Sequence, residues 1–497
     1  MKKIFTLLIL TVSFSMNAQL GPVNEGDNTG QRLSTSNADN HGDIGNNAVD
    51  LSYSNTTALS GATGASSVAL GENTTASATF STALGVGTQA NGQGSTALGS
   101  GTIAGGLYAT AIGFETSASG SYSTAMGYKT KASGLNSIAL IESSEASGYD
   151  AFAAGDYALA TGNYAIAMGN SPKASGSYSV AIGSSALADA DNTFSIGSDT
   201  KASGINALAM GNYSVASGDS SIAIGDSSKA SGKRSFAIGN QFETSATTPE
   251  YNNEAAGENS FVIGNNNSTT GLKSFSIGTD NLSTGTSSVA LGENNIASGN
   301  FSQAIGLFNQ STAYSSFAIG NNTLADGYTT FAIGSANTAD STADADNWSL
   351  DNRAFVIGNG AYNTASATLN RSDALTVLFD GTTTIAGDLN INSDMRLKAN
   401  IISLGNTLSK LLQIDGKTYT MKKDVNNKKK IGLLAQDIEK VFPELVSEAN
   451  DIKSVNYQGL VPILINALKE QQLDIDRLKA QEKRLEKLEQ IISKMNK

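Results

Sequence analysis

The sequence contains no cysteine, one histidine and one tryptophan among its 497 residues. Without cysteine the chain has no disulfide, no thiol nucleophile and no thiolate metal ligand. The lone histidine, His41, excludes a two-histidine metal site, and the Gly- and Asn-rich sequence around it predicts a surface position. We therefore expect neither a metal ion nor a cofactor.

Charged residues are scarce, at 15% of the chain, and they are unevenly distributed. Residues 19–392 contain 11 basic and 30 acidic side chains, whereas residues 393–497 contain 19 basic and 14 acidic ones. An acidic surface repels nucleic acid and anionic membranes, so neither is an expected partner of the larger part. The change in charge near residue 393 also marks a domain boundary.

Only the N-terminus carries a long apolar run. Met1-Lys2-Lys3, the apolar residues 4–14 and a small-residue exit near Ala18 are typical of a secretory signal peptide over residues 1–18. The run is too short to span a membrane, and no later stretch reaches the length of a transmembrane helix. The sequence therefore predicts an exported protein, extracellular or at the cell surface, without a transmembrane segment.

What the sequence does contain is a repeat of fourteen residues. Its marker triplets run at a constant step from Ala69-Leu70-Gly71 to Ala237-Ile238-Gly239. They resume at Val262-Ile263-Gly264 and end at Val356-Ile357-Gly358, which makes twenty units. Insertions at 240–258 and 335–353 lengthen two units without disturbing the phase, so they are interpreted as loops. A disordered low-complexity tract would keep its composition but lose its phase.

Each unit is too short for a helical hairpin and predicts one coil of a β-solenoid. Small and branched residues alternate, as in residues 179–183, and alternate residues of a strand point to opposite faces. A coil this narrow has room inside only for Ser, Ala and Gly, so the branched residues face outward and the rod should oligomerise along them. We expect the marker glycine at a two-residue corner with positive φ, and an altered corner at Ile141, which replaces it.

The units resemble the fourteen-residue head repeats of trimeric autotransporter adhesins, over about 300 residues. The resemblance implies a left-handed parallel β-roll in which three chains pack around an axis and bind matrix, cells or another surface. The end of the sequence does not resemble the membrane-anchoring segment of that family, so the means of attachment stays open. Trp348, in the second insertion, is interpreted either as a sugar contact or as part of the packing of its loop.

Residues 375–385 predict two short strands around an Asp-Gly turn. They precede the hexapeptide Ser-Asp-Met-Arg-Leu-Lys at 393–398 and further motifs at 432–437, 441–446 and 455–464. Together these motifs resemble the intramolecular chaperone domain of endosialidase-type phage tail spikes, from residue 393 to about 473. The resemblance implies a module that trimerises its parent fibre and then cuts itself off through a Ser-Lys dyad.

In this sequence the dyad corresponds to Ser393 and Lys398, and the scissile bond joins Asn392 to Ser393. A serine hydroxyl needs a base, which a neutral lysine can supply. Asp394 and Arg396 match the motif, with orienting or ion-pair roles. Five residues of a continuous helix turn through about 500°, so a bend or a neighbouring subunit must bring Ser393 and Lys398 together. The alternative is that Ser393 caps a helix and Lys398 is a solvated surface charge.

From Leu460 onward, apolar residues at spacings of three and four predict one helix that forms a short coiled coil. The predicted fold is mainly β, a left-handed parallel β-roll of fourteen-residue coils followed by an α+β module that ends in this helix. The predicted domains are a signal peptide (1–18), a leader (19–65), the β-roll head (66–365), a β neck (366–392) and the chaperone and self-cleavage domain (393–497).

The predicted function is that of a homotrimeric, adhesin-like fibre that cleaves itself once and has no activity in trans. Its ligand, a surface, a matrix or a glycan, is not identified by the sequence. Two alternatives are kept: a tail-spike-like enzyme that degrades polysaccharide, and a purely structural spacer fibre.

Overall fold

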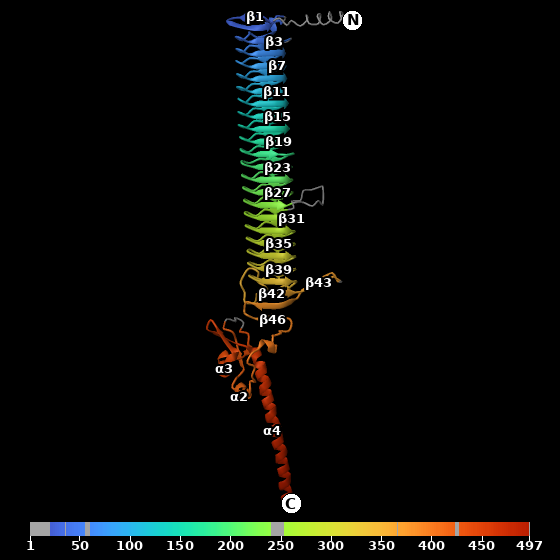
Figure 1. Ribbon diagram of the computed structural model, residues 1–497, viewed down its shortest axis with the longest axis vertical. Helices are drawn as coiled ribbons and strands as arrows, with labels where there is room; N and C mark the ends of the chain where they lie inside the picture. The colour runs from blue at the N-terminus through green and yellow to red at the C-terminus, as the bar shows by residue number, and fades with distance from the viewer. Residues whose placement is uncertain are drawn as a thin grey trace. The chain divides into compact units, whose positions relative to one another are not determined.

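The computed structural model describes residues 20–34, 36–54, 60–239, 253–364, 366–422 and 427–496. The chain forms two compact units that meet at Gly387 and Asp388. The predicted signal peptide and most of the first predicted insertion lie outside the described residues. The N-terminal unit consists almost entirely of strands, and the C-terminal unit combines short strands with helices (Figure 1).

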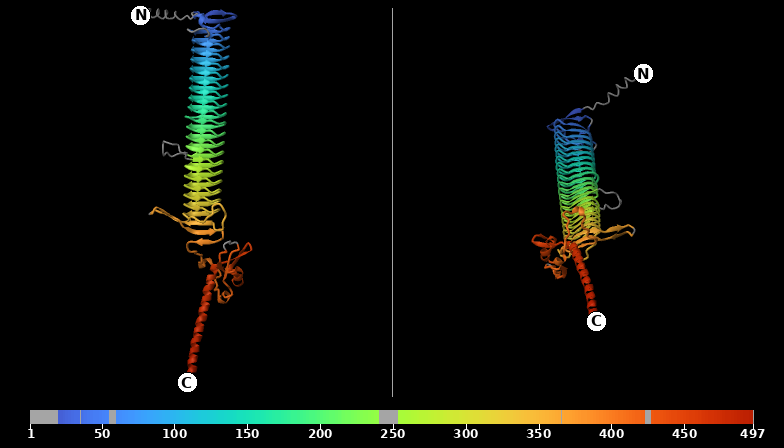
Figure 2. Two further views of the ribbon diagram at one scale, coloured as in Figure 1. Left: turned by 180° about the vertical axis from the view of Figure 1, so that it is seen from behind. Right: turned by 60° about the horizontal axis from the view of Figure 1, so that its bottom comes forward.

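The N-terminal unit is a parallel β-roll in which each coil has a long strand, a corner, a short strand and a second corner. The ladder of coils is visible from both sides in Figures 1 and 2. Long strands pair fourteen residues apart, so that Ala69 lies opposite Ala83 and Gly71 opposite Gly85. Twenty long strands repeat this pattern and confirm the predicted parallel roll.

The twenty long strands are β5 (Val68–Glu72), β7 (Thr82–Val86), β9 (Thr96–Ser100), β11 (Thr110–Phe114), β13 (Thr124–Tyr128), β15 (Ile138–Glu142), β17 (Phe152–Asp156), β19 (Ile166–Asn170), β21 (Val180–Ile182), β23 (Phe194–Ser198), β25 (Leu208–Asn212), β27 (Ile222–Asp226), β29 (Phe236–Gly239), β31 (Phe261–Asn265), β33 (Phe275–Thr279), β35 (Val289–Glu293), β37 (Gln303–Leu307), β39 (Phe317–Asn321), β41 (Phe331–Ser335) and β42 (Arg353–Asn359).

The short strands are β4 (Gly61–Ala62), β6 (Thr75–Ala76), β8 (Gln89–Ala90), β10 (Ile103–Ala104), β12 (Ser117–Ala118), β14 (Lys131–Ala132), β16 (Glu145–Ala146), β18 (Leu159–Ala160), β20 (Lys173–Ala174), β22 (Leu187–Ala188), β24 (Lys201–Ala202), β26 (Val215–Ala216), β28 (Ser228–Ala230), β30 (Asn253–Ala255), β32 (Asn267–Thr269), β34 (Leu282–Ser283), β36 (Ile296–Ala297), β38 (Gln310–Ser311) and β40 (Leu324–Ala325).

The interior of the roll is filled by small side chains, as predicted. The marker alanines, such as Ala69 and Ala125, are completely buried, whereas the next residues, Leu70 and Met126, are each 40% exposed. Buried Ser, Thr and Asn side chains form further columns inside the coils. The branched residues therefore face outward along the long strands.

The marker glycine does not occupy the predicted corner. Gly85, for example, lies inside β7 with φ +129°. A β-carbon on Gly85 would lie 1.8 Å from the carbonyl oxygen of Gly99 in the next coil, so the close stacking of backbones favours glycine at this position. The corners instead have a residue with φ near +55° at every seventh position, including Tyr108 and Glu115.

Ile141 is correspondingly a strand residue, and the altered corner predicted there was wrong. It lies in β15, pairs with Gly127 and Gly155 without a change of register, and keeps a positive φ of +88°. The insertions also leave the register intact, as predicted. Phe236 pairs with Phe261 across the first one, and Phe331 with Phe355 across the second.

The roll begins before residue 66, within the segment predicted as a leader. Strand β3 (Val49–Tyr53) pairs in parallel with β5, and β2 (Asn28–Leu33) pairs in parallel with β3. Strand β1 (Leu20–Glu25) is antiparallel to β2 and forms a hairpin with it. A short 3₁₀ helix, η1 (Ala38–Asn40), connects β2 and β3.

At the other end of the unit the strands become antiparallel. Strand β45 (Asp373–Leu378) pairs with β42 and with β46 (Thr383–Ile385) around an Asp-Gly turn, where Gly381 has φ +88°. This hairpin confirms the two strands predicted for residues 375–385. Strands β43 (Ala361–Asn363) and β44 (Thr368–Asn370) form a separate small hairpin.

The C-terminal unit packs around a small core of Ile438, Phe442, Leu445, Leu460 and Ile463. Its elements are η2 (Met395–Leu397), α2 (Leu408–Leu411), β47 (Lys417–Tyr419), β48 (Lys430–Gly432), α3 (Ala435–Val441), η3 (Pro443–Leu445), β49 (Val446–Ala449), β50 (Ile452–Val455), η4 (Tyr457–Gly459) and α4 (Leu460–Met495). The 36 residues of α4 confirm the helix predicted from Leu460. Among the helices that the structure describes, none is both long and apolar enough to cross a membrane.

Candidate self-cleavage site

A single turn of 3₁₀ helix, η2, lies between the two predicted dyad residues. Its N-cap is Asp394, whose side chain accepts a hydrogen bond from the backbone N–H of Arg396 at 2.8 Å. Its C-cap is Lys398, where the backbone returns to an extended conformation and the N–H donates to the carbonyl of Met395. A 3₁₀ turn is tighter than an α-helical turn, so the chain reverses over only a few residues.

This reversal places the two predicted residues in contact. The Nζ of Lys398 donates a hydrogen bond to the Oγ of Ser393 at a distance of 2.6 Å. The bend required by the spacing of the two residues is therefore present within one chain. The carbonyl of Asn392 directly precedes Ser393, so a hydroxyl, an amine and a peptide carbonyl lie next to one another in the chain.

Asp394 and Arg396, the supporting residues of the motif, form an ion pair that holds the turn. The Nη2 of Arg396 lies 2.6 Å from Oδ2 of Asp394, and its Nε donates to both carboxylate oxygens at 3.1 Å. These bonds from the Arg396 side chain, with the one from its backbone N–H, lower the pKa of Asp394. Neither residue contacts the Ser393 hydroxyl, so their geometry fits an orienting role.

The whole site is exposed to solvent in the single chain. Ser393 and Lys398 are exposed, and so are the apolar residues around them, including Ile391, Leu397 and Ile402. A lysine acts as a base only when it is neutral, and removal from water favours the neutral form. In the described chain the side chains of Ser393 and Lys398 are in contact, but they are not shielded from water.

His41 is not the surface residue that its sequence context predicted. Its side chain is 1% exposed, and its Nδ1 lies 3.2 Å from Oδ2 of Asp50 and 3.4 Å from Oγ of Ser52. These residues have the composition of a catalytic triad but not its geometry. A triad histidine uses a different nitrogen for each partner and faces a substrate, whereas here one nitrogen faces both partners inside the roll.

The prediction missed this buried cluster because it depends on contacts between distant segments. Arg32 from β2 lies 3.1 Å from Asp50 of β3 and 2.6 Å from Glu25 of β1, and it is 4% exposed. One signal was present in the sequence. Asp50 lies opposite Ala69, so it occupies an inward marker position that is otherwise held by small or apolar residues.

Within the described ranges, no group of three or more His, Asp and Glu side chains is arranged to hold a metal ion. The acidic residues near the C-terminal end of the roll are engaged with cations and backbone groups instead. Arg353, for example, lies 3.4 Å from both Asp340 and Asp373.

The stacked coils and the C-terminal module define a class, that of parallel β-rolls followed by an α+β domain. The model of the YadA head domain repeat matches just over half of the sequence, so the chain belongs to that family. The matched residues are 62–88, 90–116, 118–140, 146–171, 174–200, 192–214, 202–228, 216–241, 255–281, 283–309 and 311–337. The model of the chaperone of endosialidase matches residues 393–447 and begins at Ser393. Both matches confirm the resemblances seen in the sequence.

Curated relatives are fibre proteins of bacteriophages. The chain is 33% identical over 117 residues to the long tail fiber protein Gp37 of Salmonella phage S16, which is 22% of this chain and 16% of that protein. It is 34% identical over 101 residues to Gp37 of Enterobacteria phage M1, which is 18% of this chain and 40% of the relative. The chain thus spans less than half the length of these relatives.

Proposed function

We propose that the protein is an exported, trimeric, adhesin-like fibre whose C-terminal domain assembles the trimer and then cleaves itself off between Asn392 and Ser393. The observation that carries this proposal is the 2.6 Å contact between Lys398 and Ser393, at the first residue of the segment matched by the chaperone model. The phage tail fiber relatives support a fibre, and the head repeats support an adhesin.

Trimer formation is supported by apolar surfaces that a single chain leaves exposed. Along the roll, the outward residues of the long strands form a continuous apolar stripe, which monomeric proteins rarely expose. Three chains that pack along this stripe remove it from water.

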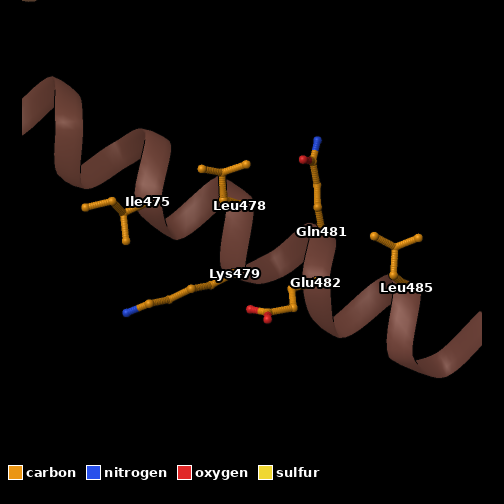
Figure 3. A pocket seen from close by; sticks show the side chains of 6 residues that line it. All are labelled: Ile475, Leu478, Lys479, Gln481, Glu482 and Leu485. Atoms are coloured by element: carbon orange, nitrogen blue, oxygen red, sulfur yellow. The ribbon is translucent and has the colours of Figure 1, made fainter.

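A second apolar surface lies on α4. Leu478 and Leu485 project from the same side of the helix, and with Ile475 they border a shallow groove that Gln481 and Glu482 complete (Figure 3). Leucines at spacings of three and four, largely exposed on an isolated helix, are the usual seam of a coiled coil. A partner helix from another copy fills this groove.

The roll needs such an assembly device because its coils are nearly equivalent. At most steps Ala pairs with Ala and Gly with Gly, as between β11 and β13, so a slip of one whole coil between chains changes few contacts. Three chains that begin at the C-terminal helices, by contrast, start in register. The C-terminal domain therefore acts before the roll closes and is not needed afterwards.

Trimerisation also supplies what the exposed dyad lacks. Packing of the apolar residues around Ser393 buries Lys398 and favours its neutral form. Lys398 then takes the proton of the Ser393 hydroxyl, and Oγ attacks the carbonyl carbon of Asn392. The C–N bond breaks as the proton passes to the amine of Ser393, and water hydrolyses the resulting ester. Because the trimer must form before cleavage can occur, a cleaved chain is one that has completed its assembly.

The test is the denatured mass of the purified wild-type protein, of two site variants and of one control variant. Wild type should give two fragments, and the smaller should begin at Ser393 and contain residues 393–497. Ser393→Ala and Lys398→Ala should remain whole, while Lys410→Ala, a lysine outside the site, should cleave normally. Cleavage in both site variants would rule out the dyad.

A further inference from the structure

Within the second insertion, residues 336–352 form a loop between β41 and β42 that is fixed to the last coils of the roll. Asn352 is buried at its base, where its Nδ2 donates to the carbonyl of Asp344 and its Oδ1 accepts from the N–H of Asp344, both at 2.9 Å. The backbone N–H groups of Tyr314 and Tyr328 donate to the carbonyls of Ala345 and Asp344. Residues 344–352 are thereby held at both their ends.

Two further sets of bonds restrain this turn. The Asp344 carboxylate accepts from the backbone N–H groups of Asn347 and Asp346, which lowers its pKa and keeps it ionised. At the end of the loop, the carbonyl of Asn352 accepts a hydrogen bond from the N–H of Phe379, the residue directly after β45. These hydrogen bonds fix the backbone of residues 344–352 against the end of the roll.

The same loop contains Trp348, the single tryptophan of the sequence. It is 58% exposed, and its ring centroid lies 6.0 Å from that of Phe379 at an angle of 55°. The ring is therefore partly packed and partly exposed, which leaves room for both interpretations of Trp348 made from the sequence. A large exposed aromatic side chain is unfavourable for solubility unless it contacts a partner. Insertions in solenoid repeats commonly carry the binding residues.

The chemistry around Trp348 selects the kind of partner. An indole ring offers a flat apolar face that packs against the C–H groups of a sugar ring. Asp346 and Asp351, exposed in the same loop, offer carboxylate oxygens that accept hydrogen bonds from hydroxyl groups. The same charges, on an acidic roll, repel sulfated or carboxylated chains.

We propose that the loop 336–352 is a binding site for neutral glycans, with Trp348 as its stacking platform and Asp346 and Asp351 as hydrogen-bond acceptors. The inference rests on the proposed function in one respect, that the fibre is the binding part of the protein. It names the ligand class of that fibre.

Because the sequence has one tryptophan, the intrinsic fluorescence of the purified protein reports directly on this site. The protein is titrated with three neutral hexasaccharides, of β-1,4-linked glucose, β-1,3-linked glucose and β-1,4-linked N-acetylglucosamine. At least one should change the tryptophan emission in a saturable way. Hyaluronan fragments of equal length should give no change, because their carboxylates face an acidic surface.

Variants then locate the binding, measured by calorimetry with the hexasaccharide that binds. Trp348→Ala should lower affinity at least about tenfold, and Trp348→Phe, which keeps a ring, should lower it less. Tyr362→Ala removes another exposed aromatic, on β43, and should change nothing. Thermal unfolding of each variant checks that the fold is retained.

The absence of a saturable signal with all three sugars overturns the proposal, and so does undiminished binding by Trp348→Ala and Trp348→Phe. Equal binding of hyaluronan contradicts the choice of neutral glycans. The mass of the C-terminal fragment is measured on the same samples. Normal cleavage without sugar binding rejects this site alone, whereas sugar binding without cleavage rejects the self-cleavage and keeps the site.

Discussion

At the scale of single residues, Ile141 has a backbone conformation unsuited to its side chain. Its φ is +88°. The other nineteen coils have glycine at this position, and most of these glycines have φ above +100°. A β-branched residue with positive φ is strained, because its β-carbon approaches its own backbone. Strand β15 keeps its register in spite of this strain, because its pairing with β13 and β17 fixes its backbone.

Ile141→Gly should therefore stabilise the roll locally. Relief of strain contributes about 1–2 kcal/mol, and the added freedom of glycine in the unfolded chain offsets about half of it. Hydrogen exchange of the amides in β13, β15 and β17 should become slower. The matched control is Ile138→Gly, in the same strand without a positive φ, which should make exchange faster. Faster exchange in Ile141→Gly would show that no strain is stored there.

Asp394 is the second residue with a specific expectation, as a positioning residue of the dyad. Asp394→Ala removes the cap of η2 and should slow self-cleavage several-fold, whereas Asp394→Asn keeps a capping oxygen and should slow it less. The dependence of the cleavage rate on pH distinguishes a role of Asp394 in positioning the dyad from a role in folding. Because the folded pKa of Asp394 is lowered, its contribution is complete above the ordinary value of 3.8 and is lost only as pH falls below it. A loss of cleavage in Asp394→Asn equal to that in Asp394→Ala would assign the effect to the ion pair instead.

At the scale of elements, the interior columns differ between the two halves of the roll. In the second half, Asn253, Asn267, Asn281, Asn295 and Asn309 form a buried ladder. Each amide oxygen from Asn253 to Asn295 accepts from the backbone and side-chain N–H groups of the next asparagine. The ladder binds successive coils together through side chains as well as backbones.

Asn281→Ala should weaken this half of the roll. The substitution leaves the carbonyl of Gly292 and the amide of Asn295 without side-chain partners, at about 1–3 kcal/mol for each buried group. Hydrogen exchange should accelerate in β33 to β37 and stay unchanged in β7 to β11. Asn281→Thr, which copies the natural Thr323 at the equivalent place, should cost less because Thr323 still donates to its neighbour. Equal exchange rates in Asn281→Ala and wild type would contradict a stabilising ladder.

The elements of the roll could be predicted because each depends on a local pattern that repeats twenty times. Alternation of small and branched residues placed Ala69 inside and Leu70 outside, and a narrow coil admits no other arrangement. The burial of His41 could not be predicted, because it comes from strands β2 and β3 closing over it. The contact of Lys398 with Ser393 was required by the motif but not derivable from spacing, since it depends on the single turn η2.

At the scale of the whole molecule, the proposed function places assembly and stability in different parts of the chain. The coils of the roll closely resemble one another. Neighbouring chains therefore have little preference for one register of packing over another. A C-terminal domain that starts the assembly and then leaves makes the product difficult to re-form once unfolded. The apolar stripe and the seam of α4 are the surfaces on which this depends.

Refolding should therefore be asymmetric. Residues 19–392 produced by self-cleavage should stay assembled and resist heat, yet fail to refold after complete denaturation. The same residues expressed without the C-terminal domain should aggregate or assemble wrongly, as judged by light scattering. Efficient refolding of the cleaved roll in the absence of residues 393–497 would mean that the chaperone role has to be abandoned.

The most direct test of the central claim is the native mass of the wild-type product. We predict one assembly with three copies of the roll, each ending at Asn392, and C-terminal fragments beginning at Ser393. The same measurement on Ser393→Ala should show three unbroken chains, because assembly precedes cleavage. A monomeric roll, or a wild-type trimer with every chain intact, would contradict the account.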